Sequence, residues 1–343
     1  TVTGLTNGTA YVFQVAAVNA AGRGSYSSTS ASVTPKSSDS TLSNLVSSAS
    51  TLSPGFTSGN QTYTLVVTNS TSSITLTPTT TDAGATVKIG GISVTSGTAS
   101  GSISLNVGTT VISVVVTAEN GTTRTYSVTV SRPSNDATLT SLVASTGALN
   151  ATFDPTVISY TQSVANSVSA MTVTAVVHDS NATIKVNGAA TSSGAASASI
   201  SLAIGSNTIQ VEVTAQDGTK ITYTIVVTRA HADQATLTIS TLAATYGQTL
   251  NLNTSGGSGS GAVTYVVSSG NCTITSGVLT PTGAGACVVV ATKAGDSTYN
   301  SISSASTTIN IDKASRTISF TAPAYSLAYG AQQTLSIATH SGG

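Results

Sequence analysis

The feature that most constrains this chain of 343 residues is an internal duplication. Residues 38–132 align with residues 135–229 without a gap, at an offset of 97 positions. Apolar residues and turn glycines match between the two copies, whereas many polar residues differ. The matched pairs include Leu42 and Leu139, Phe56 and Phe153, Tyr63 and Tyr160, Gly121 and Gly218, Tyr126 and Tyr223, and Arg132 and Arg229. This pattern indicates a shared core with a variable surface, because a duplicated active site would keep its polar residues.

Apolar residues in the repeats alternate with Ser and Thr at a period of two. Clear examples are Tyr126–Val130, Ile209–Val213 and Tyr223–Val227. Alternation of this kind predicts antiparallel strands with one buried face. Asn-Gly at 120–121 and Asp-Gly at 217–218 separate alternating runs, which predicts hairpin turns. We therefore predict an all-β chain of tandem antiparallel β-sandwich domains, arranged as beads on a string.

Composition excludes several classes of partner. Only 6% of the residues are charged, and 11 basic residues balance 11 acidic ones. A neutral, charge-poor chain has no electrostatic footprint for nucleic acid or anionic lipid. No apolar run approaches the roughly 18 residues that a transmembrane helix needs. We expect no nucleic-acid partner and no membrane span in this segment.

The first residues carry a Leu-x-x-Gly-x-x-Tyr pattern from Leu5 to Tyr11. This pattern resembles the tyrosine corner of a fibronectin type III domain, in which the phenol hydrogen-bonds to the backbone upstream. The resemblance implies that residues 1–35 are the C-terminal part of such a domain.

The duplicated segments resemble the cadherin-like β-sandwich repeat found in bacteria. The signs are the openings STLSNL and ATLTSL (40–45 and 137–142), the step of seven positions from Phe56 to Tyr63, and the closing Gly-Thr-x-x-Thr-Tyr that ends at Tyr126. The resemblance implies domains at 38–133 and 134–230. Calcium is not implied, because each linker holds only one or two acidic residues. We expect no cofactor, no metal site and no catalytic residues.

Residues 231–313 resemble a bacterial immunoglobulin-like repeat. The stretches that carry the resemblance are Asn271–Thr275, Gly283–Val290 and Ala294–Tyr299. A further copy is expected at 314–343, where Ser326–Gly330 resembles Ala243–Gly247. That segment is too short to close a sandwich, so we interpret it as the N-terminal part of another repeat.

The two cysteines, Cys272 and Cys287, are predicted to form a structural disulfide between adjacent strands. Such a bond would imply an oxidising compartment. Buried thiols and a metal pair are the alternatives, although a metal would need further ligands. The three histidines, His178, His231 and His340, are isolated in sequence, and we interpret them as surface or linker residues.

The linkers between the predicted domains are short and polar, so we expect little hinge freedom. Together the resemblances imply a non-catalytic stalk or adhesin segment of a large extracellular bacterial repeat protein, located at the cell surface. Its binding partner is unknown. A second version of this hypothesis is that the chain self-associates into a homo-oligomeric fibre, because neutral surfaces associate readily. One alternative is the spacer modules of a secreted carbohydrate-active enzyme, and another is a subunit of an extracellular filament.

Overall fold

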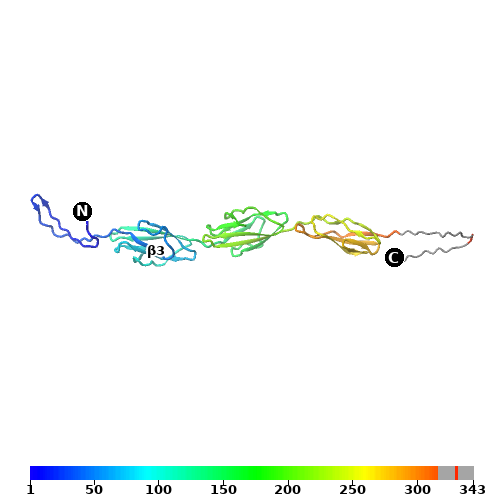
Figure 1. Cartoon of the computed structure of the whole chain (residues 1–343), viewed down its shortest axis with the longest axis horizontal. Coiled ribbons are helices and arrows are strands. Elements are labelled where there is room, and N and C mark those ends of the chain that lie inside the picture. The colour runs from blue at the N-terminus through cyan, green and yellow to red at the C-terminus, as the bar shows by residue number, and fades with distance from the viewer. Residues whose placement is uncertain (316–328, 331–343) are drawn as a thin grey trace. The chain divides into compact units, whose positions relative to one another are not determined.

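The structure is a computed structural model that describes residues 1–315 and 329–330 (Figure 1). All the regular secondary structure in these residues is β-strand, which confirms the all-β prediction. The chain divides into two compact units, Thr1–Ala230 and His231–Gly343. The duplicated segments lie in the first unit, and each of the two segments has its own apolar core.

The first copy, called here the first sandwich, holds nine strands. Five of them form a sheet in the order β4-β11-β10-β7-β8, and the others form the pairs β3-β6 and β5-β9. The strands are β3 (Leu42–Ser47), β4 (Thr62–Val66), β5 (Ser73–Ile74), β6 (Leu76–Thr80), β7 (Thr86–Ile89), β8 (Ile92–Val94), β9 (Ile103–Ser104), β10 (Gly108–Thr117) and β11 (Thr123–Arg132).

The second copy, the second sandwich, repeats this topology with a sheet β13-β20-β19-β16-β17 and the pairs β12-β15 and β14-β18. Its strands are β12 (Leu139–Ala144), β13 (Ser159–Val164), β14 (Ala170–Met171), β15 (Val173–Val177), β16 (Thr183–Val186), β17 (Ala189–Thr191), β18 (Ile200–Ser201), β19 (Gly205–Thr214) and β20 (Lys220–Arg229). The longest strands, β10 and β11, recur as β19 and β20 at the same offset that the sequences show.

Each sandwich departs from a purely antiparallel arrangement at one place. β4 pairs with β11 in parallel, and β13 pairs with β20 in the same way. The fold class is as predicted, and these two pairs are exceptions to its antiparallel arrangement. The chain leaves the β3-β6 pair after Ser47 and joins the edge of the larger sheet, and there it runs in the same direction as the last strand of its own sandwich.

The predicted alternation and hairpins are confirmed. In β11 the buried residues are Tyr126, Val128 and Val130, and the Ser and Thr between them are partly exposed. β10 and β11 pair along their full lengths, as do β19 and β20. The connecting turns place Gly121 at φ +90° and Gly218 at φ +92°, a conformation that favours glycine.

Residues 1–35 form an open ribbon rather than a closed sandwich. Tyr11 and Val33 exchange two backbone hydrogen bonds of 2.9 Å, and β1 (Val18–Asn19) pairs with β2 (Gly22–Arg23). Most side chains of the ribbon are exposed, including Val15 and Val18. The assignment of this segment to a fibronectin type III domain stays a prediction.

The second unit contains a third sandwich with its own core. Its sheets are β22-β30-β28-β25 with β29 joined to β28, the three-stranded β23-β27-β26, and the pair β21-β24. The strands are β21 (Thr238–Ile239), β22 (Ala243–Thr245), β23 (Leu250–Asn251), β24 (Thr254–Ser255), β25 (Val263–Gly270), β26 (Cys272–Thr275), β27 (Val278–Pro281), β28 (Gly285–Lys293), β29 (Ile302–Ser303) and β30 (Thr307–Asp312). The further repeat predicted at 314–343 lies almost wholly outside the described residues.

Candidate functional site

The two predicted disulfide residues are joined in the third sandwich. Cys272 begins β26 and Cys287 lies in β28, with their Cα atoms 5.9 Å apart. Both side chains are buried. The two strands are not paired neighbours as predicted, because β26 pairs with β27 and β28 pairs with β25, β29 and β30. The bond therefore ties the three-stranded sheet to the larger sheet across the core.

The predicted tyrosine corner is placed in the N-terminal ribbon. The Tyr11 hydroxyl oxygen accepts a hydrogen bond of 3.0 Å from the Thr6 N–H, one residue after the half-buried Leu5. This backbone donor lowers the pKa of Tyr11. The contact links Tyr11 to the segment just upstream, and its partner is backbone rather than a second side chain.

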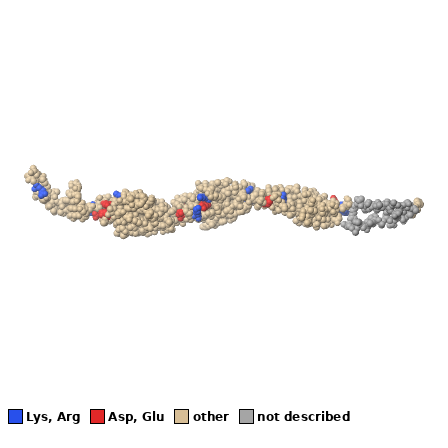
Figure 2. Space-filling view, in the orientation of Figure 1, with Lys and Arg blue, Asp and Glu red and all other residues tan. Residues whose placement is uncertain are grey.

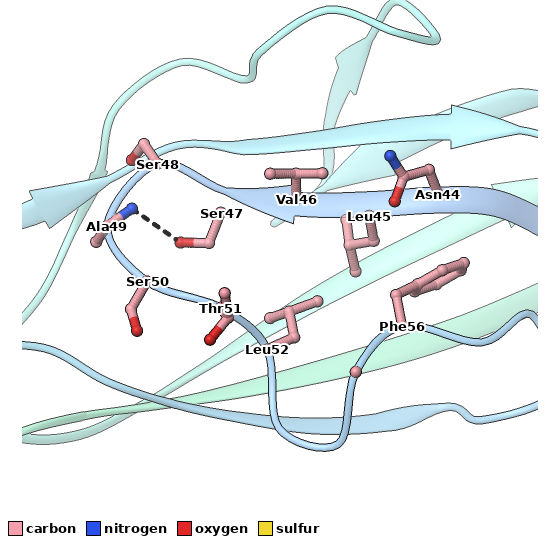
Figure 3. Close-up of a pocket in the computed structure, with 11 residues that line it drawn as sticks. Asn44, Leu45, Val46, Ser47, Ser48, Ala49, Ser50, Thr51, Leu52 and Phe56 are labelled. Carbon is pink, nitrogen blue, oxygen red and sulfur yellow. Dashed lines mark hydrogen bonds between the residues drawn. The ribbon is translucent and has the colours of Figure 1, made fainter.

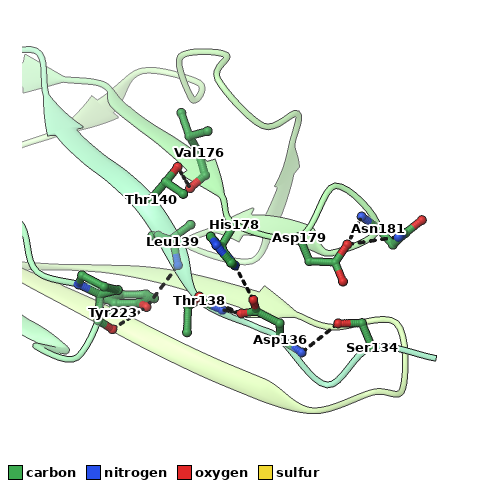
Figure 4. A network of polar contacts seen from close by, with 11 residues as sticks. Ser134, Asp136, Thr138, Leu139, Thr140, Val176, His178, Asp179, Asn181 and Tyr223 are labelled. Atoms are coloured by element: carbon green, nitrogen blue, oxygen red, sulfur yellow. Dashed lines mark hydrogen bonds and ion pairs between the residues drawn. The ribbon is translucent and has the colours of Figure 1, made fainter. Parts of the chain in front are cut away.

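An acidic residue at the entry to the second sandwich organises a polar network (Figure 4). Asp136 Oδ1 accepts hydrogen bonds from the Thr138 N–H at 2.8 Å and from the Thr138 hydroxyl at 2.6 Å. Asp136 Oδ2 lies 2.5 Å from His178 Nδ1. His178 is exposed, in agreement with its interpretation as a surface residue, and Asp136 is the partner that the sequence did not reveal. The Thr138 hydroxyl, together with His178, lowers the pKa of Asp136.

The first sandwich shows which part of this network is general. Asp39 makes the same two contacts with Thr41, at 2.8 and 2.6 Å. Thr81 stands where the second sandwich has His178, and its hydroxyl oxygen lies 2.8 Å from that of Thr41, within hydrogen-bonding distance. The shared part is a carboxylate that caps the start of the first strand. The repeated Asp-x-Thr spacing is the sequence signal for this cap, which was not among the predictions.

Two arginines at equivalent positions hold loop carbonyls. Arg132 donates to the Asn69 carbonyl at 2.7 Å and to the Leu105 carbonyl at 2.9 Å. Arg229 donates to the carbonyls of Asn166 and Leu202 in the same way. The guanidinium fork thus ties two loops to the end of the last strand. The preserved arginine pair seen in the sequence is explained by this role.

The same apolar groove occurs in both duplicated sandwiches. In the first it has a volume of about 460 Å³ and lies between β3 and the segment that follows it (Figure 3). The buried side chains of Leu45 and Leu52 and the half-buried Phe56 face one another there. The second groove, of about 470 Å³, has Leu142, Leu149 and Phe153 at the equivalent positions. No titratable side chain lines either groove.

Charged side chains are sparse on the face shown in Figure 2. One group lies on the second sandwich, where Lys220 Nζ is 3.0 Å from Glu212 Oε1. Lys185 lies opposite Glu212 on the neighbouring strand, and these residues border an open hollow of about 390 Å³. Val115 stands at the equivalent of Glu212 in the first sandwich, so the group is not part of the repeat. Exposed ion pairs of this kind contribute little to stability.

Two further observations concern the part of the chain that the structure describes. Within it, no three His, Cys, Asp or Glu side chains gather in a way that could hold a metal ion. In the same residues, no helix has the length and apolar character needed to cross a membrane.

The duplicated cores and their shared topology define a protein of tandem β-sandwich domains. A family model described as the cadherin-like beta sandwich domain matches residues 28–133 and 135–230. These ranges cover more than half of the chain, and the chain belongs to this family. The first match begins at residue 28, inside the segment predicted to belong to a fibronectin type III domain.

Individual proteins with similarity to the chain come from bacteria and animals. A protein of Evansella cellulosilytica, described as a "Putative membrane protein", is 36% identical over 101 residues, which are 29% of this chain and 15% of that protein. The chain therefore spans a small part of that relative's length.

Solved structures with similarity include the extracellular domain of protocadherin GammaB4, with 12% identity, a TM-score of 0.35, and coverage of 82% of this chain and 51% of that one. Mouse cadherin-23 repeats have 14% identity and a TM-score of 0.35, with coverage of 77% and 98%. A three-domain titin segment has 8% identity and a TM-score of 0.36, with coverage of 79% and 99%.

Proposed function

We propose that this chain is a non-catalytic structural segment of a larger extracellular bacterial protein, serving as a stalk or adhesin spacer. One observation carries the proposal: two pairs of polar side chains that the repeats preserve bind the chain's own backbone. Asp39 and Asp136 cap the first strands, and Arg132 and Arg229 hold loop carbonyls. Duplication has thus kept contacts that stabilise each sandwich, while many polar residues elsewhere have changed.

The strand order supports a mechanical role. Thr62–Val66 of β4 pairs in parallel with Ser127–Ser131 of β11, and β13 and β20 repeat this arrangement. The first strand of the large sheet therefore lies beside the last strand and points the same way. Tension applied at opposite ends of such a pair loads its hydrogen bonds in shear, all together, rather than one after another.

Two findings support an extracellular location. The Cys272–Cys287 bond is the kind that persists in oxidising compartments. The relative from Evansella cellulosilytica is described as a "Putative membrane protein", and the chain matches only a small part of it. A surface protein with many modules would accommodate both observations.

Single-molecule force spectroscopy on the chain tests the mechanical role. We expect the duplicated sandwiches to rupture one at a time, each giving an extension that matches its own length of chain. Replacing Ser127 by Pro removes the β11 N–H that donates to the Gln61 carbonyl, next to β4, at 2.7 Å. That change should lower the rupture force of the first sandwich and leave the second unchanged. Extension without separate rupture events would contradict the proposal.

A further inference from the structure

The peptide bond between the first and second sandwiches is held from both sides. The Pro133 carbonyl accepts a hydrogen bond of 2.8 Å from Asn69 Nδ2, which belongs to the first sandwich. The next N–H, that of Ser134, donates to Gln216 Oε1 at 3.2 Å, and Gln216 lies in the β19–β20 turn of the second sandwich. These two groups belong to one planar peptide unit, which does not rotate about its C–N bond. No soft backbone torsion therefore separates the two attachments.

The residues on each side of this peptide are themselves fixed. Arg132 holds the Asn69 carbonyl at 2.7 Å, so the loop that supplies Asn69 is tied to the end of β11. The proline ring restricts φ at Pro133. Ser134 is buried, and its carbonyl accepts a hydrogen bond of 2.9 Å from the Asp217 N–H. The whole junction is thus bonded into one sandwich or the other.

The junction that follows the second sandwich contains one residue that lies between the two attachments. The Ala230 carbonyl accepts a hydrogen bond of 3.0 Å from Asn166 Nδ2, as Pro133 does from Asn69. Ala232, in the third sandwich, bonds to Thr298 and Asn300 at 2.8 Å each. Between them lies His231, which is exposed. Among the residues described, nothing hydrogen-bonds to the His231 backbone. Its φ and ψ are therefore unrestrained by such contacts.

The sequence explains this difference. His231 stands at the repeat equivalent of Ser134, and Ala230 at that of Pro133, so the second exit lacks the proline ring. The receiving sandwich also changes. Gln216 supplies an acceptor for Ser134, and its equivalent Glu119 accepts the Ser37 N–H at 3.2 Å at the entry to the first sandwich. The third sandwich has a different sequence and topology, and it offers no such acceptor to His231 in the described residues.

We propose that the Pro133–Ser134 peptide is a locked junction and that His231 is a hinge. The first two sandwiches then move as one body, and bending of the chain occurs at His231. The flexibility of the junctions is independent of the resistance of each sandwich to force, so the two proposals are tested separately.

Pulsed electron paramagnetic resonance on the full chain tests this inference. Spin labels carried on unnatural amino acids at Lys88 and Lys185 report on the locked junction, and labels at Lys185 and Asn310 report on the hinge; all three positions are exposed. The native disulfide stays intact. We expect a narrow distance distribution across the first junction and a broad one across His231. Distance distributions of equal width for the 88–185 and 185–310 label pairs in the unmodified chain would overturn the proposal.

Variants then identify the residues responsible. Asn69→Ala combined with Gln216→Met removes both attachments, and the 88–185 distribution should broaden towards the width seen across His231. Gln216→Glu alone is the matched control, because Glu119 performs the same role in the first sandwich and the narrow width should remain. Circular dichroism checks that each variant is folded. A double variant that is folded and keeps the narrow width would contradict the assignment, and the comparison within the unmodified chain remains valid even if that variant unfolds.

Discussion

The phenolic oxygen of Tyr126 accepts a hydrogen bond of 3.0 Å from the N–H of Leu42, and Tyr223 accepts one of 3.2 Å from Leu139. Each tyrosine lies in the last strand of its sandwich and reaches the start of the first strand. Leu42 and Tyr126 are both fully buried, and Tyr126 in turn donates to the Ser58 carbonyl at 3.2 Å. The phenol thus joins the two ends of the sandwich through the core.

Replacing Tyr126 by Phe should destabilise the first sandwich by about 1–3 kcal/mol, because the buried N–H of Leu42 loses its acceptor. Denaturant unfolding followed by a probe in each sandwich measures the loss. The second sandwich serves as an internal control, and Tyr223→Phe should produce the reciprocal result. Equal stability of the Tyr126→Phe variant and the unmodified chain would show that water or another group satisfies this N–H.

Arg132→Lys should also weaken the first sandwich. A lysine ammonium lacks the planar fork that reaches the carbonyls of Asn69 and Leu105 together. We expect a loss of about 1–3 kcal/mol in the free energy of unfolding, the range for hydrogen bonds made by a charged group. Arg229→Lys is the matched change in the second sandwich. Retention of full stability in both variants would argue that a single carbonyl contact is sufficient.

Reduction of the Cys272–Cys287 bond should affect the third sandwich alone. The bond closes a loop with a sequence separation of 15. In the chain-entropy account, a disulfide that closes a loop of this length adds about 3 kcal/mol to the free energy of unfolding. A Cys272→Ala, Cys287→Ala variant should therefore unfold at lower denaturant concentration in the third sandwich, with the transitions of the first two unchanged. A shift in all three transitions would contradict the independence of their cores.

Asp296 should give the third sandwich a dependence on pH. The N–H groups of Ser260, Thr298 and Tyr299, at 2.7, 2.8 and 2.9 Å, hold the pKa of Asp296 well below its usual range. A carboxylate with a depressed folded pKa stabilises the protein above its unfolded pKa, about 3.9, and this contribution is lost as pH falls through the folded value.

The measurement compares Asp296→Asn with the unmodified chain in urea across this range. The variant should be less stable near neutral pH, and the gap between the two proteins should narrow progressively below about pH 4. A gap that stays constant with pH would show that Asp296 acts through its shape rather than through its charge.

Much of the fold could be predicted from the sequence. The alternation in Tyr126–Val130 predicted a half-buried strand, and the glycines at 121 and 218 predicted turns that the structure places at positive φ. The duplication predicted two equivalent cores. These predictions succeeded because each depends on neighbouring residues, whose side-chain direction and backbone freedom are set locally.

The candidate site could be predicted only in part. The cysteine pair was expected, whereas its position across two sheets was not. His178 looked isolated because Asp136, its partner, lies 42 positions away along the chain. Glu119 and Gln216 occupy equivalent positions in the repeat, and only the structure shows that both accept a backbone N–H at the entry to their sandwich.

The sequence by itself thus determined the strand type, the turns and the apolar face of each repeat, because these follow from residues close together in the chain. Only the tertiary structure decided the parallel pairing of β4 with β11 and the attachment of Ser134 to Gln216. Those contacts join residues more than 60 positions apart, and they form only after the sheets have packed and brought distant backbone groups within hydrogen-bonding distance.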